Sequence, residues 1–197
     1  MKYGEITLGQ VEAIINKLGG MKGVKLFLSG ELVIKKIERK FKIWKKVKFD
    51  TNLKTITDFL CALRNDKFRI TDFASTMIRG FNLTKNPKKI EINLIKVTVG
   101  ELGLKKHTVY SYDEVYKKAK EFGLELCPPE VGPQLRLQYK DQPQGENILV
   151  AMNPISRFND PSLFCLQHDD SKLWLSASWG GTGSWWSFDS QWIFCYK

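Results

Sequence analysis

Residues 162–179 read SLFCLQHDDSKLWLSASW and carry the clearest structural signal in the chain. Two apolar runs, 162–167 and 173–179, flank the polar segment 168–172, which contains aspartate and serine. Asp and Ser favour tight turns because their side chains form hydrogen bonds with nearby backbone groups. The pattern therefore predicts a β-hairpin in which the two runs are antiparallel strands.

The sequence around this hairpin also has the patterns of β-strands. Leu135 and Leu137 alternate with polar residues, residues 147–152 form a short apolar run, and residues 191–196 are rich in aromatic side chains. Such runs are typical of strands that bury one or both faces. We therefore expect the part of the chain after residue 134 to be an antiparallel β region.

The first part of the chain predicts mainly helices. Apolar residues recur there at helical spacing, and capping residues or glycines mark the ends, with Thr57 or Asp58 as a cap. The predicted helices cover residues 11–18, 24–30, 57–63, 71–78 and 112–122, and alternation predicts strands at 41–49 and 90–99. The whole predicts an α+β fold, with a helix-rich N-terminal part that contains a few strands and an antiparallel β C-terminal part.

Charge and aromatic residues divide the chain in opposite ways. The formal net charge is +10, but residues 1–110 hold 23 basic and 10 acidic residues, whereas residues 111–197 hold 8 and 11. Five of the six tryptophans lie after residue 173. This bias predicts a basic α+β region at 1–126 and an aromatic-rich antiparallel β region at 134–197, joined by a proline-rich segment. One continuous domain is the alternative.

The composition also excludes several classes of protein. No apolar run approaches the roughly 18 residues that a membrane-spanning helix needs. The four cysteines form no CxxC pair, and Cys61, Cys165 and Cys195 lie among apolar neighbours. Buried free thiols are typical of a reducing compartment. We expect a cytoplasmic protein that is neither exported nor membrane-anchored and that needs no metal or cofactor.

The most polarised segment is residues 35–48, which contain eight basic residues and one acid. On the predicted strand 41–49, lysines surround Trp44, and this pattern suits a single-stranded nucleic acid or another polyanion. The residues of this candidate basic strand are Lys42, Trp44, Lys45, Lys46 and Lys48. A solvated edge strand whose lysines prevent pairing is the alternative. Of the 31 basic residues, 25 are lysines, which argues against arginine-based readout of base edges.

A second candidate site is the segment 179–186, which reads WGGTGSWW. A flexible aromatic loop of this kind could bind a protein or a glycan through Trp179, Trp185 and Trp186. The alternative is a small β core that needs bulky aromatic side chains for burial. Because Trp185 and Trp186 are adjacent, a strand cannot direct both inward, and we expect one of them to be exposed.

An enzyme has little support in the sequence. Cys127, His168 and Asp169 could form a thiol- or metal-dependent site, but no motif brings them together, and His168 and Asp169 lie in the predicted turn. We therefore assign no catalytic or metal-binding residue. The prediction is a non-enzymatic binding module.

Two segments resemble a known group of sequences. Residues 14–32 read IINKLGGMKGVKLFLSGEL, and residues 123–137 read GLELCPPEVGPQLRL; the likeness continues into 148–155 and 173–180. They resemble a family of uncharacterised bacterial proteins of about this length. The resemblance implies that the two regions form one natural unit, and it implies no activity and no site residue. The basic segment 35–48 matches this family least.

Overall fold

The structure is a computed structural model, and it describes residues 6–33, 40–49, 53, 55–80, 91–157, 160–181 and 185–196. The chain divides into two compact units, Met1–Glu38 and Arg39–Lys197. The first unit contains two helices, and the second contains a sheet with further helices. Each unit is described by itself below.

The first unit is a helical hairpin. Helix α1, Leu8–Lys17, begins with a capping box in which Thr7 and Gln10 bond to each other's backbone N–H groups. Helix α2 is Gly20–Leu28. Gly19 and Gly20 have φ angles of 88° and 77°, in the left-handed region that glycine adopts without a steric cost. The predicted pair of helices with a Gly-Gly break is confirmed.

The second unit contains one mixed sheet of eight strands in the described part of the chain. The strands are β1 Lys45–Lys48, β2 Arg69–Ile70, β3 Glu91–Thr98, β4 Asn147–Val150, β5 Ile155–Arg157, β6 Asp160–Asp169, β7 Lys172–Trp179 and β8 Gln191–Tyr196. Their order is β1-β3-β8-β4-β6-β7-β2, and β5 pairs with β6. The prediction of an α+β fold is confirmed. The antiparallel prediction is only partly right, because β4 with β8 and β2 with β7 are parallel pairs.

Strands β6 and β7 form the predicted hairpin, with eight residue pairs from Ser162 with Trp179 to Asp169 with Lys172. Its turn contains only Asp170 and Ser171, whose φ angles are 46° and 60°. Two successive left-handed residues form a turn whose twist matches that of the flanking strands. The aspartate and serine identified in the sequence therefore set the register of the hairpin.

Four described helices accompany the sheet: α3 Ile56–Asn65, α4 Asp72–Gly80, α5 Tyr112–Glu121 and α6 Val131–Gln138. Helices α3, α4 and α5 confirm the predictions. The cap of α3 differs, because Thr55 and Asp58 form a capping box and Thr57 lies inside the helix.

Helix α6 corrects the sequence analysis, which predicted a helix break at 127–133 and strand-like alternation at Leu135 and Leu137. The helix begins at Val131, so residues 127–130 precede it, but Pro133 is its third residue and Leu135 and Leu137 are helical. Proline is tolerated in the first turn because the N–H that it lacks has no partner within the helix. Leu135 and Arg136 are both buried.

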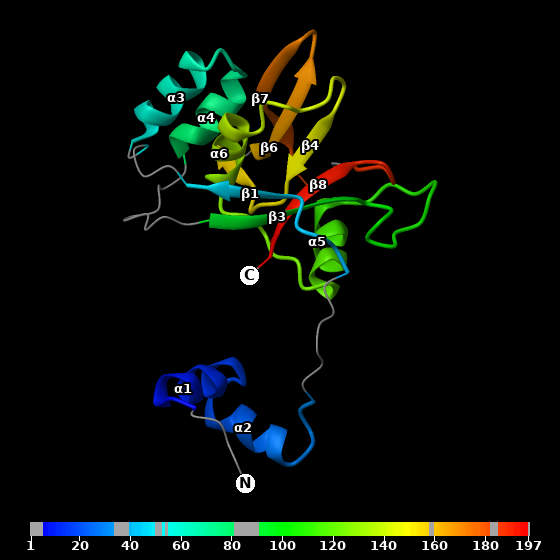
Figure 1. Cartoon of the computed structure of the whole chain (residues 1–197). Coiled ribbons are helices and arrows are strands. Elements are labelled where there is room, and N and C mark those ends of the chain that lie inside the picture. The colour runs from blue at the N-terminus through cyan, green and yellow to red at the C-terminus, as the bar shows by residue number, and fades with distance from the viewer. Residues whose placement is uncertain are drawn as a thin grey trace. The chain divides into compact units, whose positions relative to one another are not determined.

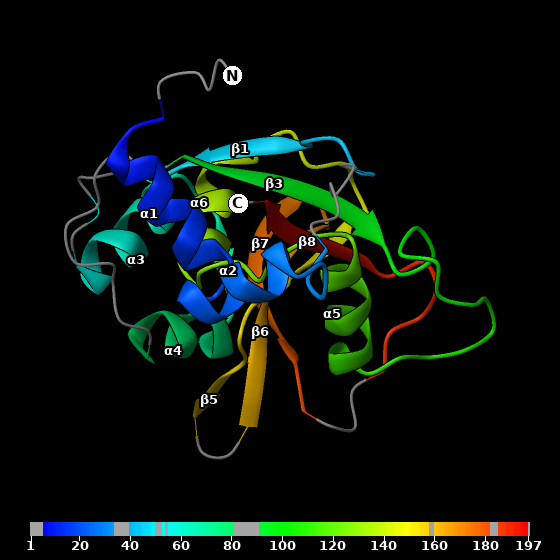
Figure 2. The ribbon, with the colours of Figure 1, turned by 90° about the horizontal axis from the view of Figure 1, so that it is seen from below.

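The helices cover two faces of the sheet (Figures 1 and 2). Paired residues on neighbouring strands point to the same face. The register therefore places Trp192, Val97 and Leu149 on one face of the sheet, and Ile193 and Lys96 on the other. We call them the Trp192 face and the Lys96 face. Tyr116 of α5 packs on the Trp192 face, 5.7 Å from the ring of Trp192.

Strands from both predicted regions belong to this one sheet. Strand β3 pairs with β8 over six residues, from Asn93 with Tyr196 to Thr98 with Gln191. The predicted boundary between residues 126 and 134 therefore lies inside the unit Arg39–Lys197. Among the described residues, no helix has both the length and the hydrophobicity to cross a membrane.

Candidate functional site

A fully buried arginine lies at the centre of a polar network on the Lys96 face. Arg136 of α6 donates hydrogen bonds to the backbone oxygen of Tyr139 and to the side-chain oxygen of Gln142. Its guanidinium also lies 5.1 Å from the ring centroid of Phe68. Burial lowers the pKa of Arg136 to about 10, so the side chain stays charged at neutral pH. A buried cation of this kind needs hydrogen-bond partners in a fixed position.

Gln142 extends the network to two strands. Its side-chain nitrogen donates to the backbone oxygens of Glu146 and Leu166, at 3.0 and 3.1 Å. The backbone oxygen of Gln142 lies 2.6 Å from Nδ1 of His168. These contacts hold the loop 139–146 against β6, and β4 begins directly after this loop.

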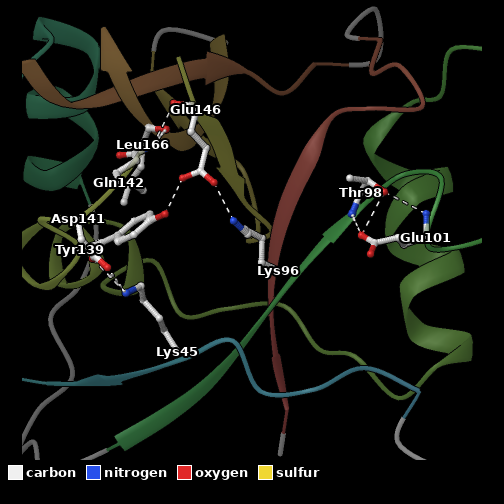
Figure 3. Close-up of polar contacts among 9 residues, drawn as sticks. All are labelled: Lys45, Lys96, Thr98, Glu101, Tyr139, Asp141, Gln142, Glu146 and Leu166. Atoms are coloured by element: carbon white, nitrogen blue, oxygen red, sulfur yellow. Dashed lines mark hydrogen bonds and ion pairs between the residues drawn. The ribbon is translucent and has the colours of Figure 1, made fainter. Parts of the chain in front are cut away.

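Glu146 contributes a second buried charge to the network, as Figure 3 shows. Its carboxylate accepts a hydrogen bond of 2.7 Å from the hydroxyl of Tyr139 and forms an ion pair of 2.7 Å with Lys96. Burial, and then the hydrogen bond to Glu146, raise the pKa of Tyr139, so its hydroxyl remains a donor. The network therefore ties α6, β3 and β4 together.

The candidate basic strand meets this network at one end. Trp44 is half-buried, and its ring packs edge to face on Tyr139 at 4.9 Å. The ammonium groups of Lys45 and Lys96 lie 5.5 and 5.0 Å from the Trp44 ring. Trp44 is thus not the freely exposed aromatic ring that the predicted strand implied. The regular strand β1 begins only at Lys45, one residue later.

Two of the predicted lysines are paired with acids. Lys45 forms an ion pair with Asp141 at 3.2 Å, and Lys46 forms one with Glu91 at 2.9 Å. The hydrogen bond from Lys45 lowers the pKa of Asp141, and the hydrogen bond from Lys46 lowers the pKa of Glu91. Lys42 and Lys48 are exposed. Residues 35–39 of the basic segment lie outside the described residues.

A polar pocket of about 400 Å³ lies by the Trp192 face of the sheet. Asn147, Leu149, Cys165 and Gln167 share this face by register and form part of the floor. The segment 186–191 contributes further polar residues, among them Ser187, Asp189 and Ser190. The lining residues are Gly145, Glu146, Asn147, Leu149, Cys165, Gln167, Ala177, Ser178, Trp186, Ser187, Asp189, Ser190 and Gln191.

The polar groups of this pocket are mainly amides and hydroxyls. The side-chain oxygen of Gln191 is buried and has no hydrogen-bond partner among the described residues. By register, Gln191 shares the Lys96 face with Ile148, so this unpaired oxygen lies across the sheet from the side chains of Asn147 and Gln167. The lining contains no lysine or arginine, and the carboxylate of Glu146 is bonded to Tyr139 and Lys96.

The tryptophans separate as the sequence predicted, with one of the adjacent pair exposed. Trp185 is 61% exposed, whereas Trp186 is 7% exposed and packs on Trp192 at 5.0 Å. Trp179 is half exposed at the end of β7. Of the candidate aromatic residues, only Trp186 lines the polar pocket. Residues 182–184 of this loop lie outside the described residues.

The cysteines are buried with one exception. Cys127, Cys165 and Cys195 are buried free thiols, but Cys61 is exposed on α3, contrary to the prediction. The sulfur of Cys127 contacts Cys195, and the ring of His168 contacts Gln142, so neither contact supports the imagined thiol site. No cluster of three potential metal ligands occurs among the described residues.

Sequence reasoning missed the residues that form the network and the pocket. Arg136, Gln142 and Glu146 gave no motif, because polar residues between prolines and glycines are typical of surface loops. Asn147 and Gln167 come from two different strands, and only the sheet register brings them together. A charged residue between Leu135 and Leu137 was the one available signal for a buried arginine.

Comparison with known proteins gives no match: no family model, no curated protein and no solved structure matches this chain. The resemblance to uncharacterised bacterial proteins therefore stays a prediction. The function has to be argued from the site itself.

The ion pair between Lys96 and Glu146 has a matched control on α5. Lys118 and Glu121 are also 2.7 Å apart, but their side chains are 31% and 53% exposed, against 26% and 7% for Lys96 and Glu146. Lys96→Met should lower the free energy of unfolding by about 3 kcal/mol, because it leaves a buried carboxylate unpaired. Lys118→Met should cost less than about 0.5 kcal/mol. Urea denaturation measures both, and equal losses would contradict the assignment.

Proposed function

We propose that the protein is a non-enzymatic binding module in the cytoplasm and that it binds a neutral, hydroxyl-rich ligand such as a short glycan. The polar pocket beside Trp186 is the proposed site. The observation that carries the proposal is a concave surface of about 400 Å³ lined by the amides of Asn147 and Gln167, by serine hydroxyls and by an indole. Ligand sites in proteins combine a cavity of this size with a few convergent polar groups.

The side chains of the pocket suit sugar hydroxyls. A hydroxyl group both donates and accepts, and so do the amides of Asn147 and Gln167 and the hydroxyls of Ser187 and Ser190. An indole offers an apolar face against which the C–H face of a sugar ring can pack. Trp186 lines the pocket, and because it is only 7% exposed it presents a small part of its ring there.

The charge of the pocket argues against phosphorylated ligands. Asp189 is the acidic side chain of the lining whose carboxylate is not engaged by the buried network, and the lining includes no basic residue. A phosphate would meet repulsion without a cation to compensate it. The pocket and the basic strand therefore favour ligands of opposite character.

The position on the sheet argues against an extended peptide. Peptides that bind sheets usually add a strand to an exposed edge, where backbone groups lack partners. The strands that line the pocket are β4, β6, β7 and β8, and β4, β6 and β8 each pair with a strand on either side. A ligand here has to bind through side chains.

The proposal predicts weak but measurable binding of neutral oligosaccharides. Saturation-transfer NMR with cellotriose, maltotriose and chitotriose should give a signal for at least one sugar. Gln167→Ala removes an amide from the floor of the pocket. It should raise the dissociation constant of the sugar about tenfold, which corresponds to roughly 1.4 kcal/mol of binding free energy. Isothermal titration calorimetry measures the change.

Gln144→Ala is the matched control, because Gln144 is an exposed glutamine of the neighbouring loop and does not line the pocket. It should bind the sugar as the wild type does. Absence of any sugar signal, or equal binding by the Gln167→Ala variant, would sink the proposal.

A second candidate function is polyanion binding by the basic strand, and the exposed lysines Lys42, Lys46 and Lys48 favour it. Lysines on a surface attract phosphate backbones through counterion release. The pairing of Lys45 with Asp141 and of Lys46 with Glu91 reduces the free positive charge, which is why we place this function second.

Polyanion binding predicts a strong dependence on salt. With about three phosphate contacts, the affinity for a single-stranded oligonucleotide should fall roughly 20-fold between about 50 and 200 mM salt. Changing Lys42, Lys46 and Lys48 to glutamate should abolish binding in fluorescence anisotropy. The control changes Lys105, Lys106 and Lys172, three exposed lysines elsewhere, by the same charge. Equal loss in both triple variants would show that only net charge matters.

A further inference from the structure

Two buried cysteines lie in contact although 68 positions separate them in the chain. The sulfur atoms of Cys127 and Cys195 are 2.8 Å apart. Both thiols are free, and both residues are buried. A disulfide requires a sulfur–sulfur distance of about 2.05 Å, so the two atoms need to approach by only about 0.75 Å.

The backbone around the two cysteines is held by regular pairing. Glu125 and Cys195 exchange two backbone hydrogen bonds of 2.9 Å, as in an antiparallel pair. The backbone nitrogen of Cys127 donates to the oxygen of Ala151 at 2.7 Å. The sulfur of Cys127 also lies 3.7 Å from the backbone oxygen of Ile193. These contacts hold both side chains in place before any bond forms.

The geometry points to an intramolecular disulfide between Cys127 and Cys195, formed by exchange with a low-molecular-weight disulfide such as oxidised glutathione. One protein thiolate attacks the small disulfide and releases one thiol. The second protein thiolate then attacks the mixed disulfide and releases the other thiol. The protein loses two protons and two electrons, and the small disulfide gains them as it becomes two thiols.

The environment determines the rate of this exchange. Burial, and then the hydrogen bond from Cys195, raise the pKa of Cys127 well above its ordinary value. Because the thiolate is the nucleophile, the reaction is slow at neutral pH. Its rate should rise about tenfold for each unit by which the pH is increased, as long as the pH stays below that pKa.

The disulfide would lie beside a second pocket and would restrain the segments that line it. A cavity of about 380 Å³ is lined by the end of α5, by residues 123–126 and by Phe194 of β8. Cys127 directly follows residues 123–126, and Cys195 directly follows Phe194. Oxidation would therefore link the two sides of this cavity covalently and limit their separation.

Peptide mapping of the full chain tests the disulfide. The exposed Cys61 is first changed to alanine, so that it cannot react with the reagent. Trypsin places Cys127, Cys165 and Cys195 in three separate peptides, because Arg136 and Lys172 lie between them. After incubation with oxidised glutathione, mass spectrometry should find the Cys127 peptide linked to the Cys195 peptide, with two hydrogens fewer. Dithiothreitol should reverse the change.

Cys165→Ser serves as the control, because Cys165 is a third buried thiol that is hydrogen-bonded to Asn147. This variant should still form the link, and Cys195→Ser should not. Recovery of Cys127 and Cys195 as free thiols after oxidation would overturn the inference. Links between molecules, or links that involve Cys165, would overturn it as well.

Discussion

The buried guanidinium of Arg136 is the constraint on which the site depends. A charged group removed from water costs several kcal/mol unless the protein supplies its hydrogen bonds. Arg136 finds them at Tyr139 and Gln142 in the following loop. Gln142 then fixes Glu146 and Leu166, and Glu146 takes Lys96 as a counterion. A single short helix is in this way connected to strands on both sides of β8.

The polar network lies on the Lys96 face of the sheet, and the proposed binding pocket lies by the Trp192 face. The network packs on the Lys96 face and determines where β4 begins, at Asn147. By register, the side chains of Asn147 and Gln167 point to the other face, where they form the floor of the polar pocket. A pocket whose floor rests on interior strands keeps its shape without a ligand, which lowers the cost of binding.

Much of the fold could be predicted from the sequence, because its signals are local. The turn residues of the β6–β7 hairpin and the glycines between α1 and α2 act within a few residues. Helix α6 could not be predicted, because Pro133 reads as a break unless it lies in the first turn. The pocket could not be predicted either, because Asn147 and Gln167 meet only through the pairing of β4 with β6. The exposure of one member of the Trp185–Trp186 pair could be predicted, since adjacent residues of an extended chain point in opposite directions, but not which of the two.

Backbone hydrogen exchange of an Arg136→Met variant tests the central claim most directly. Methionine fills much of the volume of arginine but supplies none of its hydrogen bonds. If the network holds the loop and the start of β4, residues 139–150 should exchange at least about tenfold faster than in the wild type, while helix α5 keeps its protection. Unchanged exchange in 139–150, or an equal acceleration in α5, would contradict the account.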